Sequence, residues 1–270
     1  MFQIACAADR ILPRQLIAAG ANLLLQLRND DSRSFSVDSR GNWVNRQPAA
    51  TFVSPDIYTS EYDQVRDRVL EYWCYGYTPK PGDTVVEIGA GIGEEAVIFS
   101  HLVGPEGRVI AVEAHPQTFA CLEATIAQSG LANVVAVQCA ITNEDGQITI
   151  SDSNVHVANS VLDAGGGVTV RSRSLDSLLD ELGVATVDLL KMNIEGAEQA
   201  AVKGMANSAR RMRYVAISCH DFIADAGGSE QFRTREFIKA ALRDHGFEIA
   251  QRTDAPHPWL RDTVFGRRAG

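Results

Sequence analysis

The sequence is short of positive charge. It has 25 lysines and arginines against 34 acidic residues, which leaves a net charge of −9. This balance argues against a nucleic-acid binder that relies on a broad basic face. Arg210, Arg211 and Arg213 form one local basic patch, which we interpret as the solvated end of a helix. We therefore expect no nucleic-acid partner.

The sequence also lacks paired cysteines and long apolar runs. Its five cysteines are scattered and form no CxxC pair: Cys6, Cys74, Cys121, Cys139 and Cys219. Such a set predicts buried reduced thiols, which suit a cytoplasmic protein. No apolar run approaches the roughly 18 residues needed to cross a membrane, and Asp9 and Arg10 come too early for a secretory signal. We expect a cytoplasmic protein without a membrane span.

What is present is an alternation of strand and helix patterns. Strands are predicted at 84–88, 108–113, 134–142, 187–194, 213–218, 247–252 and 263–267. Short connections through helices predict a doubly wound α/β fold, with a mostly parallel seven-stranded sheet and helices on both of its faces. The last two strands are predicted to form an antiparallel pair.

Two stretches lie outside this alternation. Residues 1–53 are interpreted as an N-terminal appendage, with a helix in 11–27 and a hairpin around 39–42. Residues 143–173 are polar and glycine-bearing, with short strands near both ends. A connection this long inside a compact domain is usually functional or mobile, so we interpret it as a flap beside a cleft.

The chain is organised around a strand, a glycine turn and a helix start, TVVEIGAGIGEEA. Gly89, Gly91 and Gly93 allow positive φ and a close approach of the backbone to a ligand. Their spacing differs from the GxGxxG pattern of dinucleotide sites. The acids at 87, 94 and 95 would also repel a pyrophosphate.

The next strand supplies a second signal for the ligand. Glu113 ends this strand, where a carboxylate is placed to accept hydrogen bonds from ribose hydroxyls. An adenosyl ligand without phosphate and with a cationic end fits both Glu113 and the acids around the glycine turn. S-adenosylmethionine is such a ligand.

Two sets of motifs resemble a known family. The segments VVEIGAGIGEEA and VIAVEAHP resemble the nucleotide-binding half of Rossmann-like, class I methyltransferases that use S-adenosylmethionine. The segment VRSRSLDSLLDELGVATVDLLKMNIEGAE is similar to the signature of the FkbM family. The resemblance implies a Rossmann-like methyltransferase domain over 54–270. We expect the methyl donor to contact Glu87, Gly89, Ala90, Gly91, Gly93, Glu113, Ala140 and Asn193.

The resemblance further implies O-methylation of a hydroxyl on a sugar or natural product. The expected partner is a small-molecule or oligosaccharide acceptor, and a homodimer stays open. Tyr58 or Tyr62 is a candidate for the rim of the cleft, and Trp259 for stacking on a sugar, although each could be a core aromatic. Two alternatives remain, an NAD-dependent oxidoreductase and a catalytically inactive donor-binding subunit. Asn193 keeps the second open, because the family usually has Asp there.

His220 and Glu195 are the candidate catalytic residues. Class I enzymes bind the donor at the carboxyl ends of the strands, where both residues fall. His220, with an ordinary pKa of about 6.5, is the first candidate for the general base. Glu195 is the second candidate, as a base or as a clamp on the acceptor. Structural alternatives are a strand cap for His220 and a favourable acid at a helix N-terminus for Glu195.

Two further residues follow from charge and position. Lys191 lies within an apolar strand, so it needs a partner, and Glu195 or Glu87 could serve. Some sugar O-methyltransferases use Mg²⁺, which Glu195 and Asp221 could hold here. Two acids make a thin case for such a site, and Asn193 weakens it further.

Overall fold

The structure, a computed structural model, describes residues 12–151 and 167–268. Its main strands are β4 Thr84–Ile88, β5 Arg108–Glu113, β6 Val134–Gln138, β10 Val187–Met192, β11 Met212–Ser218, β12 Phe247–Gln251 and β13 Thr263–Arg268. They form one seven-stranded sheet in the order β12-β13-β11-β10-β4-β5-β6. Only β13 runs against its neighbours, β11 and β12. The mostly parallel sheet and its antiparallel C-terminal pair are confirmed.

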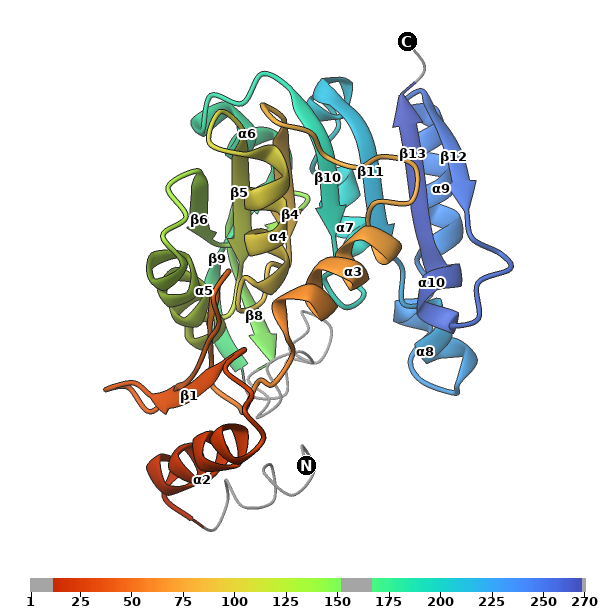
Figure 1. The fold of residues 1–270 in the computed structure, drawn as a ribbon. Coiled ribbons are helices and arrows are strands. Elements are labelled where there is room, and N and C mark those ends of the chain that lie inside the picture. The colour runs from red at the N-terminus through yellow and green to blue at the C-terminus, as the bar shows by residue number, and fades with distance from the viewer. Residues whose placement is uncertain (1–11, 152–166, 269–270) are drawn as a thin grey trace.

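Helices cover both faces of this sheet (Figure 1). They are α3 Tyr62–Tyr72, α4 Glu94–Val103, α5 Pro116–Ser129, α6 Leu175–Glu181, α7 Glu198–Lys203, α8 Asp221–Asp225, α9 Arg235–Asp244 and α10 Pro258–Asp262, with 3₁₀ turns η2 Ser208–Arg211 and η3 Glu230–Phe232. Side chains of α3, α4 and α5 share one core with Val85. Those of α6, α7 and α9 share a second core with Val86. Consecutive residues of a strand point to opposite faces, so β4 serves both cores.

The prediction of one strand over 134–142 is wrong, because the chain leaves the central sheet at Cys139. β6 ends one residue earlier, and Ala140–Thr142 form β7 in a different sheet. The break lets Cys139 pack in the main core while Ala140 packs beside Ile150. No glycine or proline marks this bend, and the exposed Gln138 is the only polar residue between Val134 and Ile141, so the sequence gives little sign of it.

The second sheet is built largely from the segment interpreted as a flap. It has the order β7-β9-β8, where β8 is Gly146–Ser151 and β9 is Gly167–Ser174. The short strands predicted near both ends of the segment are therefore confirmed. Residues 152–166 between them lie outside the described residues, so the flap itself stays a prediction. Ser174 then caps α6 by accepting a hydrogen bond from the backbone N–H of Ser177.

A small unit precedes the central sheet in the chain. It consists of α2 Arg14–Leu27 and a sheet of β1 Ser34–Val37, β2 Trp43–Arg46 and β3 Thr51–Ser54. A helix and a hairpin thus lie where the sequence predicts them, and a third strand extends the hairpin. β3 packs on α5, where the Val53 N–H donates to Thr125 Oγ1 at 3.0 Å. The predicted boundary at residue 53 therefore falls inside a strand.

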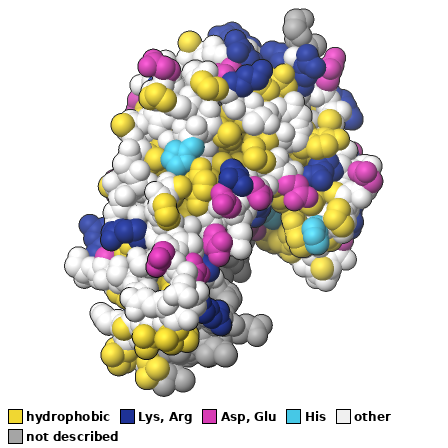
Figure 2. Space-filling view, viewed as in Figure 1, with side chains coloured by type: hydrophobic (Ala, Val, Ile, Leu, Met, Phe, Trp, Pro, Cys, Tyr) yellow, Lys and Arg dark blue, Asp and Glu magenta, His cyan; other side chains and the backbone are white. Residues whose placement is uncertain are grey.

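The helix α2 presents apolar side chains on two sides. Ala18 packs with Phe35 and Trp43 of the small sheet. Leu16 and Leu27 are among the leucines of α2 that remain exposed, and Figure 2 shows hydrophobic side chains gathered over this part of the molecule. Within the two described ranges, no helix combines the length and the apolar character needed to cross a bilayer.

Candidate functional site

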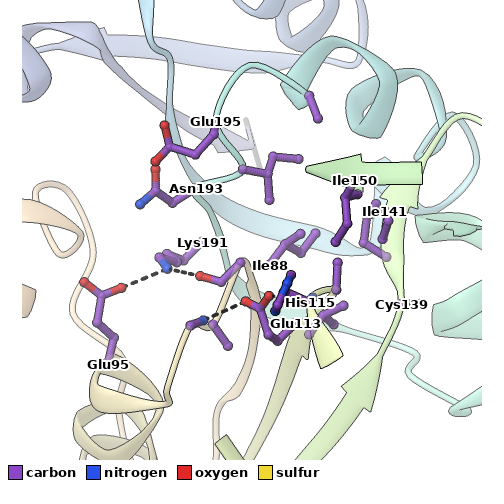
Figure 3. Close-up of a pocket in the computed structure, with 18 of the residues that line it drawn as sticks. Ile88, Glu95, Glu113, His115, Cys139, Ile141, Ile150, Lys191, Asn193 and Glu195 are labelled. Atoms are coloured by element: carbon purple, nitrogen blue, oxygen red, sulfur yellow. Dashed lines mark hydrogen bonds and ion pairs between the residues drawn. The ribbon is translucent and has the colours of Figure 1, made fainter. Parts of the chain in front are cut away.

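A pocket opens where β4, β5 and β10 end, at the carboxyl edge of the parallel strands (Figure 3). It brings together most of the residues predicted to contact a donor, namely Gly89, Ala90, Gly91, Glu113, Ala140 and Asn193, and also the catalytic candidate Glu195. Parallel strands meet their ligands at this edge because the turns after them converge there.

The three glycines of the turn after β4 have different reasons to be glycine. A Cβ on Gly89 would lie 2.0 Å from the Asn193 carbonyl oxygen, and one on Gly93 would lie 2.6 Å from a methyl of Leu122. Close packing therefore leaves no room for a side chain at either position. Gly91 has φ +56 and nothing within 4 Å of the same point. The backbone at Gly91 therefore leaves open space at the pocket.

Glu113 is held in place by backbone donors. Its two carboxylate oxygens accept hydrogen bonds from the N–H groups of Gly91 and His115, each at 2.9 Å. Burial raises the pKa of Glu113, and these two bonds offset part of that rise. Each oxygen keeps a further lone pair, so the carboxylate can also accept from a ligand hydroxyl.

The floor of the pocket carries a buried charge cluster. Lys191 Nζ lies 3.1 Å from Glu87, 2.8 Å from Glu95 and 3.0 Å from the Gly89 carbonyl oxygen. Trp73 flanks the cluster, since its Nε1 donates to Glu95 at 2.8 Å and its ring lies 4.9 Å from Nζ. Of the two partners predicted for Lys191, Glu87 is confirmed. Glu195 is not a partner, and Glu95 takes the second place.

Burial and charge have opposite effects on the protonation of this cluster. Burial raises the pKa of Glu87 above its usual range, against the opposing effect of Lys191. Burial alone would lower the pKa of Lys191, but the charges of Glu95 and Glu87 outweigh it and raise that pKa. Lys191 lines the pocket, whereas the Glu87 carboxylate, fully buried, is turned to the lysine.

Glu195 follows β10 in a strained turn. Its φ is +50, in the left-handed region that non-glycine residues rarely occupy, and Gly196 follows with φ +93. The helix α7 begins only at Glu198. Glu195 therefore belongs to the turn between strand and helix, and its side chain lines the pocket.

His220 sits between two carboxylates. Its Nδ1 lies 2.8 Å from Glu198, and its Nε2 lies 3.4 Å from Glu195. Burial alone would lower the pKa of His220, but the two carboxylates overcome it and raise the pKa to about 10. The two carboxylates thus favour the charged imidazole over the neutral form that a general base requires.

The remaining predicted residues lie elsewhere or are engaged. Asp221 is buried and accepts from the backbone N–H groups of Thr234 and Arg235. Within residues 12–151 and 167–268, no group of three His, Cys, Asp or Glu side chains could hold a metal ion. Trp259 is 44% exposed and stacks on His257 with ring centroids 4.5 Å apart. The Mg²⁺ expectation thus finds no support here, and sugar stacking by Trp259 stays a prediction.

Sequence reasoning missed Glu95 as a partner of Lys191 and Glu198 as a partner of His220. Both stand in the first turn of a helix, where an acid is favourable in any helix and gives no sign of a specific partner. The sequence offered one sign of the Glu95 contact, because a buried lysine such as Lys191 needs more than one partner. The contact between Glu198 and His220 joins residues from two separate turns, which spacing does not predict.

Comparisons with known proteins agree with this geometry. Residues 87–249 match the family model described as the methyltransferase FkbM domain. The 31-O-demethyl-FK506 methyltransferase FkbM of Streptomyces tacrolimicus is 26% identical over 68% of this chain and 79% of its own. The hexuronic acid methyltransferase AglP of Haloferax volcanii is 26% identical over 63% of this chain and 71% of its own.

A solved structure has the same fold. Methyltransferase FkbM from Methylobacillus flagellatus superposes with a TM-score of 0.52 at 19% identity. The match covers 77% of this chain and 50% of that one, so the present chain corresponds to half of the solved protein. At this identity the likeness concerns the fold alone.

Proposed function

The chain belongs to the FkbM family of S-adenosylmethionine-dependent methyltransferases, and we propose that it methylates a hydroxyl of a sugar or of a glycosylated natural product. The observation that carries this proposal is the Glu195 carboxylate, held in a left-handed turn at the donor pocket. The relatives are named for methylation of FK506 and of a hexuronic acid, and these names support an oxygen acceptor.

The described residues fit the methyl donor. Glu113 keeps lone pairs for the ribose hydroxyls, and the open space at Gly91 admits a ligand next to the backbone. The Oδ1 of Asn193 is buried without a hydrogen-bond partner among the described residues. A buried acceptor of this kind requires a donor, which an ammonium group supplies. The donor, when bound, provides a methyl group activated by a sulfonium.

The chain supplies two things for methyl transfer to oxygen. The first is alignment of the hydroxyl with the methyl group, which is worth up to roughly 7–11 kcal/mol in well-oriented reactions. The second is an acceptor for the hydroxyl proton, which adds about 10²–10⁴-fold. Glu195 lines the pocket and is the candidate for this role, and His220 lies outside the lining, 3.4 Å from its carboxylate. Ala140 and Ile150 line the opposite wall, which is apolar.

A methyltransfer screen tests the proposal. The protein is incubated with labelled S-adenosylmethionine and a panel of methyl glycosides, oligosaccharides and glycosylated natural products, with Mg²⁺ and with chelator in parallel. We expect label in at least one hydroxylated acceptor, with the methyl group on oxygen by NMR. Transfer to nitrogen or carbon acceptors alone would contradict the proposal.

Two alternatives from the sequence are addressed by the same samples. The family assignment removes the support for an NAD-dependent oxidoreductase. A catalytically inactive donor-binding subunit would bind S-adenosylhomocysteine in calorimetry and transfer no label to any acceptor. Turnover above the buffer background excludes it.

A further inference from the structure

The contacts of His220 assign separate tasks to the two catalytic candidates. We propose that His220 is a positioning residue, clamped between Glu198 and Glu195, and that it fixes the Glu195 carboxylate as the group that accepts the proton of the acceptor hydroxyl. This division of roles rests on the proposed O-methylation, but the clamp itself can be tested without any acceptor.

Glu198 is the fixed end of this clamp, because its side chain is held by several hydrogen bonds. Its side chain is fully buried and accepts hydrogen bonds from the Gly196 N–H at 3.0 Å and from Thr234 Oγ1 at 3.3 Å. The same carboxylate receives His220 Nδ1 at 2.8 Å. A ring fixed at one nitrogen and 4% exposed has little freedom to rotate. Its other nitrogen is therefore aimed in a fixed direction.

That direction is toward Glu195. The distance from Nε2 to the Glu195 carboxylate is 3.4 Å, and Glu195 lines the donor pocket while His220 does not. The left-handed backbone at Glu195 is unfavourable for a residue with a Cβ, and such strain persists only where surrounding contacts hold it. The ion pair with His220 is one contact that stabilises this conformation.

The charges around His220 determine which residue can take a proton. Glu195 and Glu198 face it from the turn after β10 and from α7. Asp221, the next residue in the chain, accepts two backbone N–H groups and lies 3.8 Å from Arg235 at the start of α9. Asp262 pairs with the same arginine. The carboxylates at both of its nitrogens favour the protonated ring, and such a ring has no lone pair for an incoming proton.

The chemical step balances with Glu195 as the acceptor. As the acceptor oxygen forms its bond to the methyl carbon, the carbon–sulfur bond breaks and its electron pair stays on sulfur. The hydroxyl proton passes to the Glu195 carboxylate and from there to solvent. His220 keeps its proton throughout, and its positive charge holds the carboxylate in the orientation that receives the hydroxyl.

The first test follows His220 directly and requires no acceptor. Nitrogen-15 NMR of the imidazole in the full chain, with S-adenosylhomocysteine added, reports the protonation of His220 between pH 6 and 10. We expect a doubly protonated ring through neutral pH, and an ordinary titration in Glu198→Gln. His245→Gln is the matched control and should leave the signal of His220 unchanged. A ring that is neutral at pH 7.5 in the wild type would overturn the proposal.

The second test separates positioning from base catalysis. Glu198→Gln and His220→Gln should each lower kcat by up to about 10²-fold, the cost of misplacing a reacting group by about 1 Å, with the KM for S-adenosylmethionine changed less than twofold. The wild-type kcat should fall above about pH 9 as the ring loses its charge, and His220→Gln should lose this alkaline decline. A kcat that rises with pH through this range would make His220 the base. If donor affinity in these variants fell as much as kcat, the role of the clamp would be structural only. Both results contradict the proposal.

Discussion

The two sides of the cleft are held together by different forces. On the donor side, the glycine turn and Glu113 are fixed by backbone hydrogen bonds, and the charge of Lys191 is balanced beneath them. On the side that we propose for the acceptor, Glu195 has an unfavourable φ and is held by side-chain contacts that run through His220 to Glu198. A backbone-fixed site is expected to lose binding when it is damaged, whereas a site fixed by side-chain charges is expected to lose turnover.

The largest expected effect lies on the acceptor side. Glu195→Gln keeps the size of the side chain and removes its charge, so no strong proton acceptor remains next to the hydroxyl. We expect kcat to fall by about 10²–10⁴-fold, while calorimetry finds S-adenosylhomocysteine binding unchanged. Glu94→Gln also removes a carboxylate from the lining, from a partly exposed pair with Arg68. This control should lose less than about fivefold. Equal losses of kcat in Glu195→Gln and Glu94→Gln would show that Glu195 has no special role in turnover.

The second prediction concerns the floor of the donor side. Lys191→Met leaves Glu87 and Glu95 buried without their cation, and breaking a buried ion pair on one side typically costs about 3–5 kcal/mol. Urea unfolding should show this loss. Adding Glu95→Gln to Lys191→Met should recover part of it, because the carboxylate nearest to the missing cation is removed. Lys80→Met, at an exposed position, should stay within about 0.5 kcal/mol of the wild type. A loss in the double variant equal to the sum of the two single losses would show that Lys191 and Glu95 are not coupled.

The same contrast explains what the sequence could predict. The donor side is encoded locally, because a strand, three glycines and an acid at the end of the next strand are enough to indicate an adenosyl ligand. The position of Lys191 within an apolar strand predicts that it has a buried acidic partner. Glu87 lies opposite it in register on the adjacent strand. The other side joins Glu195 and Glu198, both in the segment after β10, to His220 in the segment after β11. Only the folded chain shows that their charges meet and change the protonation of the histidine.

The third prediction tests the donor side by binding. Glu113→Gln replaces one carboxylate oxygen with an amide N–H₂, which cannot accept from the backbone donors that hold Glu113. Hydrogen bonds to charged groups contribute about 1.5–3 kcal/mol, so the affinity for S-adenosylhomocysteine should fall about tenfold or more by calorimetry. At saturating donor, kcat should change far less than in Glu195→Gln. A variant with full affinity and reduced kcat would contradict the role of Glu113 in binding the donor.

The fourth prediction uses pH to sharpen the contrast in stability. The folded-state pKa of His220 is raised to about 10, whereas the unfolded value is about 6.5. A raised pKa stabilises the fold fully below pH 6.5, and the stabilisation is lost as pH rises toward 10. The free energy of unfolding should therefore fall between pH 7 and 10 by on the order of 2 kcal/mol more in the wild type than in His220→Gln. Parallel curves for the two proteins would contradict the charged clamp.

The smallest expected effect concerns the charge of the acceptor. The pocket lining has four carboxylates, Glu94, Glu95, Glu113 and Glu195, and one lysine. An acceptor with its own carboxylate meets net repulsion on the side where Glu195 must approach it. We expect kcat/KM to be a few-fold higher for methyl glucoside than for methyl glucuronide, and the ratio to narrow with added salt, because charges beyond about 10 Å are screened at 0.1 M. A preference for the glucuronide that Glu195→Gln leaves unchanged would mean that the acceptor approaches from a side that these carboxylates do not reach.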